Sequence, residues 1–353
     1  MWRPGLDLAA FLGSAVVALA LVVWGPRLSP SGETGPITFL LLVIGIDVAH
    51  VYSTLFRTYL DREELARRPI LYAGVPTLCF AALLTVSAAL PGRLWTVLAY
   101  VALAHFIRQQ VGWVAIYRAR AAARGAPSTR LERVVDDAAT YAGAGYPVLL
   151  WHTQLPRRFE WFVAGDFLEI PGGSWVSAAR ALWIATLALY VLVAVRRAVR
   201  HRLLEIGKHL VVATTAVTWY VGIVATDSDF AFTAANVIPH GVPYLVFLYA
   251  YAKRRGAERP GLVRAVAARG ALAFSAILVT LAFVEELAWD RLVWHTHDEL
   301  FGFVRSHSVS EGALVWIVPL LMVPQATHYV LDAFLWRRRE TSRSQAEAMG
   351  FTA

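Results

Sequence analysis

The sequence predicts an all-α protein: a polytopic transmembrane helix bundle of about ten spans with both termini in the cytoplasm. Three observations predict this fold. Apolar residues make up 58% of the 353 residues and charged residues only 16%, whereas a soluble domain has about 25% charged residues. The apolar residues come in blocks of about twenty, the length that crosses a hydrocarbon core of about 30 Å. The basic residues stand in short clusters between those blocks.

Each apolar block is expected to form one span of a single integral membrane domain that covers residues 1–353. The first block is interpreted as a span rather than a signal peptide, because it lacks a clear small-x-small cleavage site. The fifth carries Asp136 and Asp137 near one end, which we interpret as an entry-turn feature. The expected spans lie near residues 6–24, 37–56, 70–90, 94–117, 134–151, 175–195, 210–225, 230–251, 271–288 and 312–336.

The distribution of Lys and Arg sets the expected orientation. Segments on the same side as residues 57–69 hold 25 basic residues, and the segments on the opposite side hold six. By the positive-inside rule the richer side is cytoplasmic, which suits the inner membrane of a bacterium. The net charge of +8 therefore reflects basic residues in the cytoplasmic segments rather than a surface that binds nucleic acid. The lone Cys79 excludes an internal disulfide and a cysteine-based metal site.

Four of the expected spans carry histidines. Ionisable residues inside a membrane are energetically costly, so they are candidates for functional sites. One such histidine is more often a hydrogen-bond partner between helices than a ligand, but four on separate spans favour a metal. Each has a polar neighbour three or four residues away, on the same helix face, where it could accept the other ring N–H. The pairs are Asp47/His50, His105/Gln109, Asn236/His240 and His328/Asp332.

The first basic residue after each histidine, such as Arg57 after His50, indicates how far that histidine lies from the inner surface of the membrane. The four histidines then either share one metal site in the inner half of the membrane or form two pairs. The shallower pair would be His50 and His328, and the deeper pair His105 and His240.

Other polar residues in these spans are candidates for supporting roles. Asp47 and Asp332 are expected to orient histidine rings rather than to bind the metal. Arg108 either bridges to Asp47 or holds a substrate carboxylate, and Tyr244 is a further catalytic candidate in the eighth span. A proton-relay role stays open for Glu285 and Glu286. The loop histidines His295 and His297 are expected to be solvated.

At these segments the chain resembles the Brp/Blh family of membrane β-carotene 15,15′-dioxygenases. The resemblance covers about forty residues and is carried by IPHG around His240 and by HYVLDAFLWR around His328 and Asp332. The first site reads DVAH, where the family has a Pro-His-Gly string, and HFIRQQ lacks the acid that follows in the family. The resemblance implies a multi-span protein whose histidines hold a non-haem iron that cleaves a polyene with O2.

The sequence therefore predicts a membrane-embedded non-haem Fe(II) oxygenase that acts on a lipophilic, carotenoid- or lipid-like substrate. Histidine with an occasional carboxylate suits Fe(II), and open coordination positions would admit O2; zinc and copper are the alternative metals. Two other functions stay open. One is a proton-coupled transporter, in which histidines and carboxylates relay protons, and the other is a non-catalytic protein that binds haem or a pigment.

Overall fold

The computed structural model describes residues 4–90, 92–258, 261–335 and 343–349. Within these residues the only regular structure is helical, so the predicted all-α class is confirmed. Arg3, Arg259 and the arginines at positions 337–339, which contribute to the expected topology, lie outside the described residues, as does residue 336, the expected end of the last span.

Each of the ten expected spans coincides with a helix. Eight stretches of the described chain are long and apolar enough to cross a membrane, which makes this an integral membrane protein. They are Gly5–Leu28, Pro36–Arg57, Pro69–Ala89, Ser174–His201, Ile206–Ala225, Asp229–Ala257, Ala271–Trp294 and Glu311–Phe334. The fourth and fifth expected spans are not among these eight. The fourth carries the polar residues His105, Arg108, Gln109 and Gln110, and the fifth carries Asp136 and Asp137. The count of ten therefore stays a prediction, as does the single domain.

The chain divides into two compact units, each built from separate stretches of sequence. Unit 1 comprises residues 1–33, 99–243 and 349–353, and unit 2 comprises residues 34–98 and 244–348. The chain passes from one unit to the other within α7 and within α11. The two helices shared by the units are α7 (Leu94–Ala123) and α11 (Asp229–Glu258). The other helices of unit 1 are α1 (Pro4–Asp7), η1 (Leu8–Gly13), α2 (Ser14–Leu28), α8 (Arg130–His152), α9 (Ser174–His201), α10 (Ile206–Trp219) and η4 (Tyr220–Ala225).

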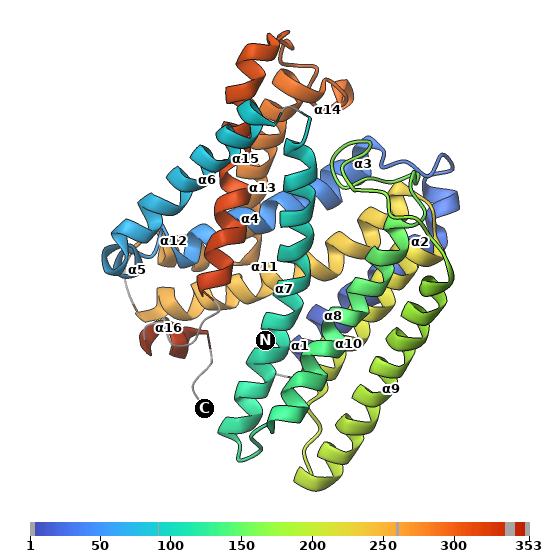
Figure 1. The fold of residues 1–353 in the computed structure, drawn as a ribbon. Helices are drawn as coiled ribbons and strands as arrows, with labels where there is room; N and C mark the ends of the chain where they lie inside the picture. The colour runs from blue at the N-terminus through green and yellow to red at the C-terminus, as the bar shows by residue number, and fades with distance from the viewer. Residues whose placement is uncertain (1–3, 91, 259–260, 336–342, 350–353) are drawn as a thin grey trace. The chain divides into compact units, whose positions relative to one another are not determined.

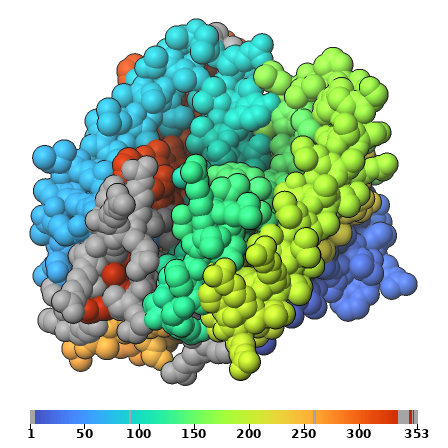
Figure 2. Space-filling view, turned by 60° about the horizontal axis from the view of Figure 1, so that its bottom comes forward, coloured from blue at the N-terminus to red at the C-terminus, as the bar shows by residue number. Residues whose placement is uncertain are grey.

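In unit 1, α8 packs between α9 and α10 (Figure 1). Helix α8 begins with a capping box, in which Thr129 and Glu132 satisfy each other's backbone N–H groups. Gly143 lets α8 approach α10 closely, because a Cβ there would lie 3.3 Å from the Cα of Ala216. Figure 2 shows α9, in yellow-green, along the surface. Its side chains are mostly exposed, as expected of a helix whose outer face contacts lipid.

Buried charges connect the helices of unit 1. The Lys208 ammonium lies 3.3 Å from an Asp136 oxygen and 3.0 Å from a Glu205 oxygen. The Arg197 guanidinium contacts Glu205 at 2.6 Å and Glu132 at 2.8 Å. Asp136 is thus part of a buried ion-pair network rather than an entry-turn feature. This pairing compensates the charges of α8, which are costly to bury singly.

Unit 2 packs α6 against α15, and α13 against η2 and α4 (Figure 1). Helix α5 is capped by the Asp61 side chain, and α6 begins with Pro69 at its first position. The segment η2 is a π-helix that leads directly into α4, and such segments often accompany functional sites. The helices of unit 2 are α3 (Pro36–Thr38), η2 (Phe39–Val48), α4 (Ala49–Ser53), η3 (Thr54–Arg57), α5 (Arg62–Arg67), α6 (Pro69–Ala89), α12 (Leu262–Ala267), α13 (Ala271–Trp289), η5 (Asp290–Trp294), α14 (Asp298–Phe301), α15 (Glu311–Leu335) and α16 (Arg343–Ala348).

Candidate metal centre

Unit 2 brings two of the predicted histidines together. The ring of His50, from α4, lies 5.0 Å between centroids from the ring of His328, from α15. The ring of Tyr244, from α11, lies 5.8 Å from His50 and 5.5 Å from His328. All three side chains are buried, with at most 2% of each residue exposed. The expected shallower pair is therefore a pair in space.

A hydrogen-bond chain runs from His328 to a carboxylate. Thr54 Oγ1 lies 2.7 Å from His328 Nδ1 and 3.0 Å from the Tyr244 hydroxyl. The Tyr244 hydroxyl donates to Asp332 Oδ1 at 2.7 Å. Thr54 cannot be recognised as a site residue from the sequence, because single threonines are common in apolar spans and its partners are distant in the chain.

The direction of this chain selects one tautomer of His328. The Tyr244 proton points at Asp332, so the tyrosine oxygen is left to accept from the Thr54 hydroxyl. Thr54 Oγ1 can then accept a proton from Nδ1 of His328. In this arrangement every bond points toward the carboxylate and each polarises the next. His328 would be neutral with its proton on Nδ1, the tautomer in which the lone pair is on Nε2.

The acid partners lie near the rings but beyond hydrogen-bond length. Asp332 Oδ2 is 4.0 Å from His328 Nε2, and Asp47 Oδ1 is 3.6 Å from His50 Nδ1. Asp332 Oδ2 is buried and has no hydrogen-bond partner among the described residues. Because a metal–ligand bond is about 2.1 Å, one ion could reach both Nε2 and Oδ2. His328 Nε2 and Asp332 Oδ2 therefore offer one imidazole nitrogen and one carboxylate oxygen, donors that suit a divalent transition metal.

An apolar cavity of about 210 Å³ opens beside His328 in unit 2. Thr54 and His328 are the polar residues of the candidate centre that line it, and the rest of its wall is mainly aliphatic and aromatic. Its walls come from α4, η3, the turn after η3, α6 and α15, and include Val51, Leu55, Tyr59, Pro76, Val323 and Leu331. A cavity of this composition suits part of an apolar chain.

Unit 1 holds the other two predicted histidines. The ring of His105, from α7, lies 5.2 Å between centroids from the ring of His240, from α11. Phe106 stacks on His240 at 3.6 Å with the planes only 7° apart. The sequence predicts that Gln109 accepts a hydrogen bond from the His105 ring. Its Nε2 instead donates to the backbone carbonyl of His240 at 2.9 Å. The expected deeper pair is thus also a pair in space.

Aromatic side chains pack around this second pair. Trp161, from the segment between α8 and α9, contacts Phe106 at 5.0 Å between centroids. Asp166 holds that segment in place by accepting backbone N–H bonds from Trp161 at 3.0 Å and Phe162 at 2.6 Å. Phe167, nearby in the segment, is buried with 4% exposed. The aromatic-rich segment therefore belongs to the core of unit 1.

The remaining predicted residues are placed as follows. Arg108 is exposed and makes no ion pair with a described residue of its own unit. His295 is exposed, whereas His297 is half-buried and stacks on Phe39 at 4.0 Å. Arg57, the residue used to judge the depth of His50, is fully buried. A fully buried arginine cannot mark the membrane surface. The expected depth of His50, which is counted from Arg57, therefore has no support.

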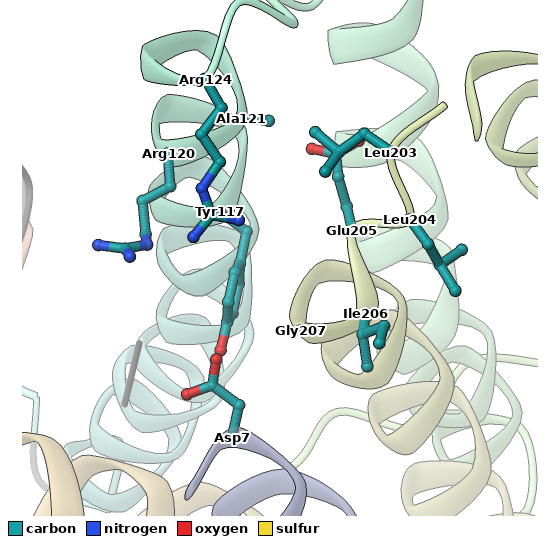
Figure 3. Close-up of a pocket in the computed structure, with 10 residues that line it drawn as sticks. All are labelled: Asp7, Tyr117, Arg120, Ala121, Arg124, Leu203, Leu204, Glu205, Ile206 and Gly207. Atoms are coloured by element: carbon teal, nitrogen blue, oxygen red, sulfur yellow. The ribbon is translucent and has the colours of Figure 1, made fainter. Parts of the chain in front are cut away.

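A second cavity, of about 110 Å³, lies in unit 1 (Figure 3), and none of the predicted histidines lines it. Arg120 and Arg124 of α7 line one side, and the start of α10 lines the other. Gly207 is required there, because a Cβ would fall 2.1 Å from the Tyr117 ring. Tyr117 is twelve residues beyond His105, about 18 Å along α7. This cavity is therefore not part of the candidate metal centre.

Comparisons with protein-family models, with curated proteins and with solved structures find no match to this chain. Fold and site define the class of protein: an all-helical integral membrane protein with buried histidine pairs. Its function is inferred below from the chemistry of the described residues, because a fold alone does not specify an activity.

Proposed function

We propose that this protein is a membrane-embedded non-haem iron oxygenase that acts on a lipophilic substrate. We propose His50, His328 and Asp332 as the ligands. Two histidines and one carboxylate form the ligand set typical of non-haem Fe(II) oxygenases, with positions left open for O2. The observation that carries the proposal is the directed chain from His328 through Thr54 and Tyr244 to Asp332. It sets the tautomer of His328 and places Asp332 Oδ2 4.0 Å from Nε2 of the same histidine.

Each side chain then has a definite task. Thr54 keeps the proton of His328 on Nδ1, so that Nε2 stays a lone-pair donor. Tyr244 binds Asp332 Oδ1 and thereby holds Oδ2 toward Nε2. Asp47, 3.6 Å from His50 Nδ1, favours the His50 tautomer with its proton on that nitrogen. When bound, iron would supply the coordination positions at which O2 meets the substrate.

The apolar cavity beside His328 supports a lipophilic substrate. A chain that enters from the bilayer would lie against Val323 and Leu331 and would bring one segment near Thr54 and His328. The aliphatic wall would exclude water from that segment. The resemblance to the Brp/Blh family points to the same class of reaction. A carotenoid or another long apolar molecule is the proposed substrate.

The role of His105 and His240 belongs to the same proposal. Both rings are buried in an apolar, aromatic setting, and the form of histidine that binds metals is the neutral imidazole. The prediction that they share a metal with His50 and His328 stays a prediction. It can be tested by metal analysis, because loss of His240 would then remove the same ion as loss of His328.

The proposed topology has ten spans, with both ends in the cytoplasm of a bacterial inner membrane. It is supported by the 25 to six distribution of basic residues. Reporter fusions after Arg68, Arg130, Lys208, Arg264 and Arg343 should all report the cytoplasm. A periplasmic signal at any of them would remove a span from the proposal.

The function can be tested with nitric oxide, which occupies the open positions that O2 would use. Purified protein in lipid nanodiscs is loaded with Fe(II) without oxygen and then exposed to nitric oxide. We expect the half-integer-spin electron paramagnetic resonance signal of an iron–nitrosyl centre. It should be absent from His328→Ala and present in His295→Ala, the matched loop control. Iron that binds without forming this adduct would contradict an oxygenase, because no position would be open.

A proton-coupled transporter is the second candidate function. The observation in its favour is a pair of buried glutamates in α13, Glu285 and Glu286, with 6% and 8% exposed. Buried carboxylates within a span are typical of proton pathways. Metal-independent uptake of a solute driven by a pH gradient in proteoliposomes would support this function over the oxygenase.

A further inference from the structure

Glu285 and Glu286 are adjacent in sequence, but unit 2 surrounds them differently. Glu285 accepts a hydrogen bond from the Tyr52 hydroxyl at 2.5 Å and one from Gln325 Nε2 at 3.3 Å. Glu286 accepts no hydrogen bond from any described residue, although 92% of it is buried. The two acids therefore differ in the feature that stabilises a carboxylate, namely donors aimed at its oxygens.

The charges around Glu286 have the same sign. Its electrostatic neighbours are Glu285 on α13, Asp47 on η2 and Asp290 on η5. Among the described residues, no Lys, Arg or His forms an ion pair with Glu285 or Glu286, and the nearby Arg291 is bound to Asp290 and Asp298. The other titratable groups that face Glu285 are the phenols of Tyr52 on α4 and Tyr329 on α15.

This arrangement assigns different protonation states to the two acids. Moving a carboxylate into an apolar region without a counter-ion is so costly that the group takes up a proton instead. Neighbouring carboxylates oppose each other's ionisation, and the one without donors becomes the acid. We propose that Glu286 is a proton-binding site, a carboxylic acid at neutral pH beside an ionised Glu285.

The site would exchange its proton with water at the expected outer face. Eight residues of helix separate Glu286 from Trp294, the end of its candidate span, which is about 12 Å. Exchange forms or breaks one O–H bond and transfers no electrons. The proposal is independent of the iron centre, since neither glutamate contacts His50 or His328 and each function considered above could draw on the proton.

Infrared spectroscopy of the whole protein in nanodiscs tests this directly. A protonated carboxyl has a C=O stretch that is separate from the carboxylate bands. We expect this band at pH 7 in the wild type, its loss in Glu286→Gln, and no change in Glu299→Gln, an exposed control on α14. In Glu285→Gln the band should persist at acidic pH but disappear at a lower pH than in the wild type, because the repulsion that favours the acid is gone.

An isotope label makes the test independent of any variant. In wild-type protein made with carboxyl-labelled ¹³C-glutamate, the band should move to lower frequency, whereas a band from Asp47 or Asp290 would stay. A wild-type band that does not move with this label would overturn the proposal, and so would a folded Glu286→Gln that retains the full band.

Discussion

Thr54→Val tests the hydrogen-bond chain on which the metal centre depends. The substitution keeps the shape of the side chain but removes Oγ1, and with it the contacts of 2.7 Å to His328 Nδ1 and 3.0 Å to Tyr244. Loss of a partner that orients a ligating histidine typically weakens metal affinity about 10–100-fold. That corresponds to about 1.4–2.7 kcal/mol of binding free energy. Leaving buried groups without their partner would also destabilise the fold by about 1–3 kcal/mol.

The assay is a competition titration of the protein in nanodiscs against a fluorescent chelator, first with Fe(II) and then with Zn(II). Thr327→Val is the matched control, since Thr327 is buried, precedes His328 in α15 and lines the same cavity. We expect the metal Kd to rise 10–100-fold in Thr54→Val and less than about threefold in Thr327→Val. Equal affinities in the two variants would refute the claim that Thr54 sets the tautomer of His328.

Two further predictions concern acids of unit 2. Asp332→Asn should lower bound metal as strongly as His328→Ala, because Oδ2 is proposed as a ligand; retention of most of the metal would return Asp332 to an orienting role. Burial alone would raise the pKa of Asp61, but hydrogen bonds from Arg255 and Tyr251 outweigh it and hold that pKa below its usual 3.8. Asp61 therefore stabilises the fold above about pH 4, and this contribution is lost as pH falls through the lowered pKa. The melting temperatures of wild type and Asp61→Asn in detergent should differ at pH 7 and converge below pH 4, and a constant difference would contradict the assignment.

Much of the fold could be predicted from the sequence, because hydrophobic length is a local property. All ten expected blocks coincide with helices, even α8 with its Asp136 and Asp137. What could not be predicted is how α8 compensates those charges. Lys208, the partner of Asp136, is 72 residues away in the chain, and neither residue reveals the other in the sequence.

The candidate site could be predicted in part for the same reason. Each isolated histidine in an apolar span can be recognised from the sequence alone. Its burial in the protein is expected because exposing it to lipid would be costly. Which histidines pair depends on helix neighbours, so the pairs His50/His328 and His105/His240 remained one of two possibilities. Thr54 could not be predicted, because it is far in sequence from both Tyr244 and His328.

Metal analysis of the purified protein tests the central claim most directly. Wild-type protein reconstituted with Fe(II) and freed of loosely bound metal should hold about one iron per chain. His50→Ala and His328→Ala should hold almost none, while His295→Ala should match the wild type; loss of iron from His240→Ala as well would show that the pairs share one ion. Wild-type protein that retains no metal, or His328→Ala that retains all of it, would contradict the metal centre.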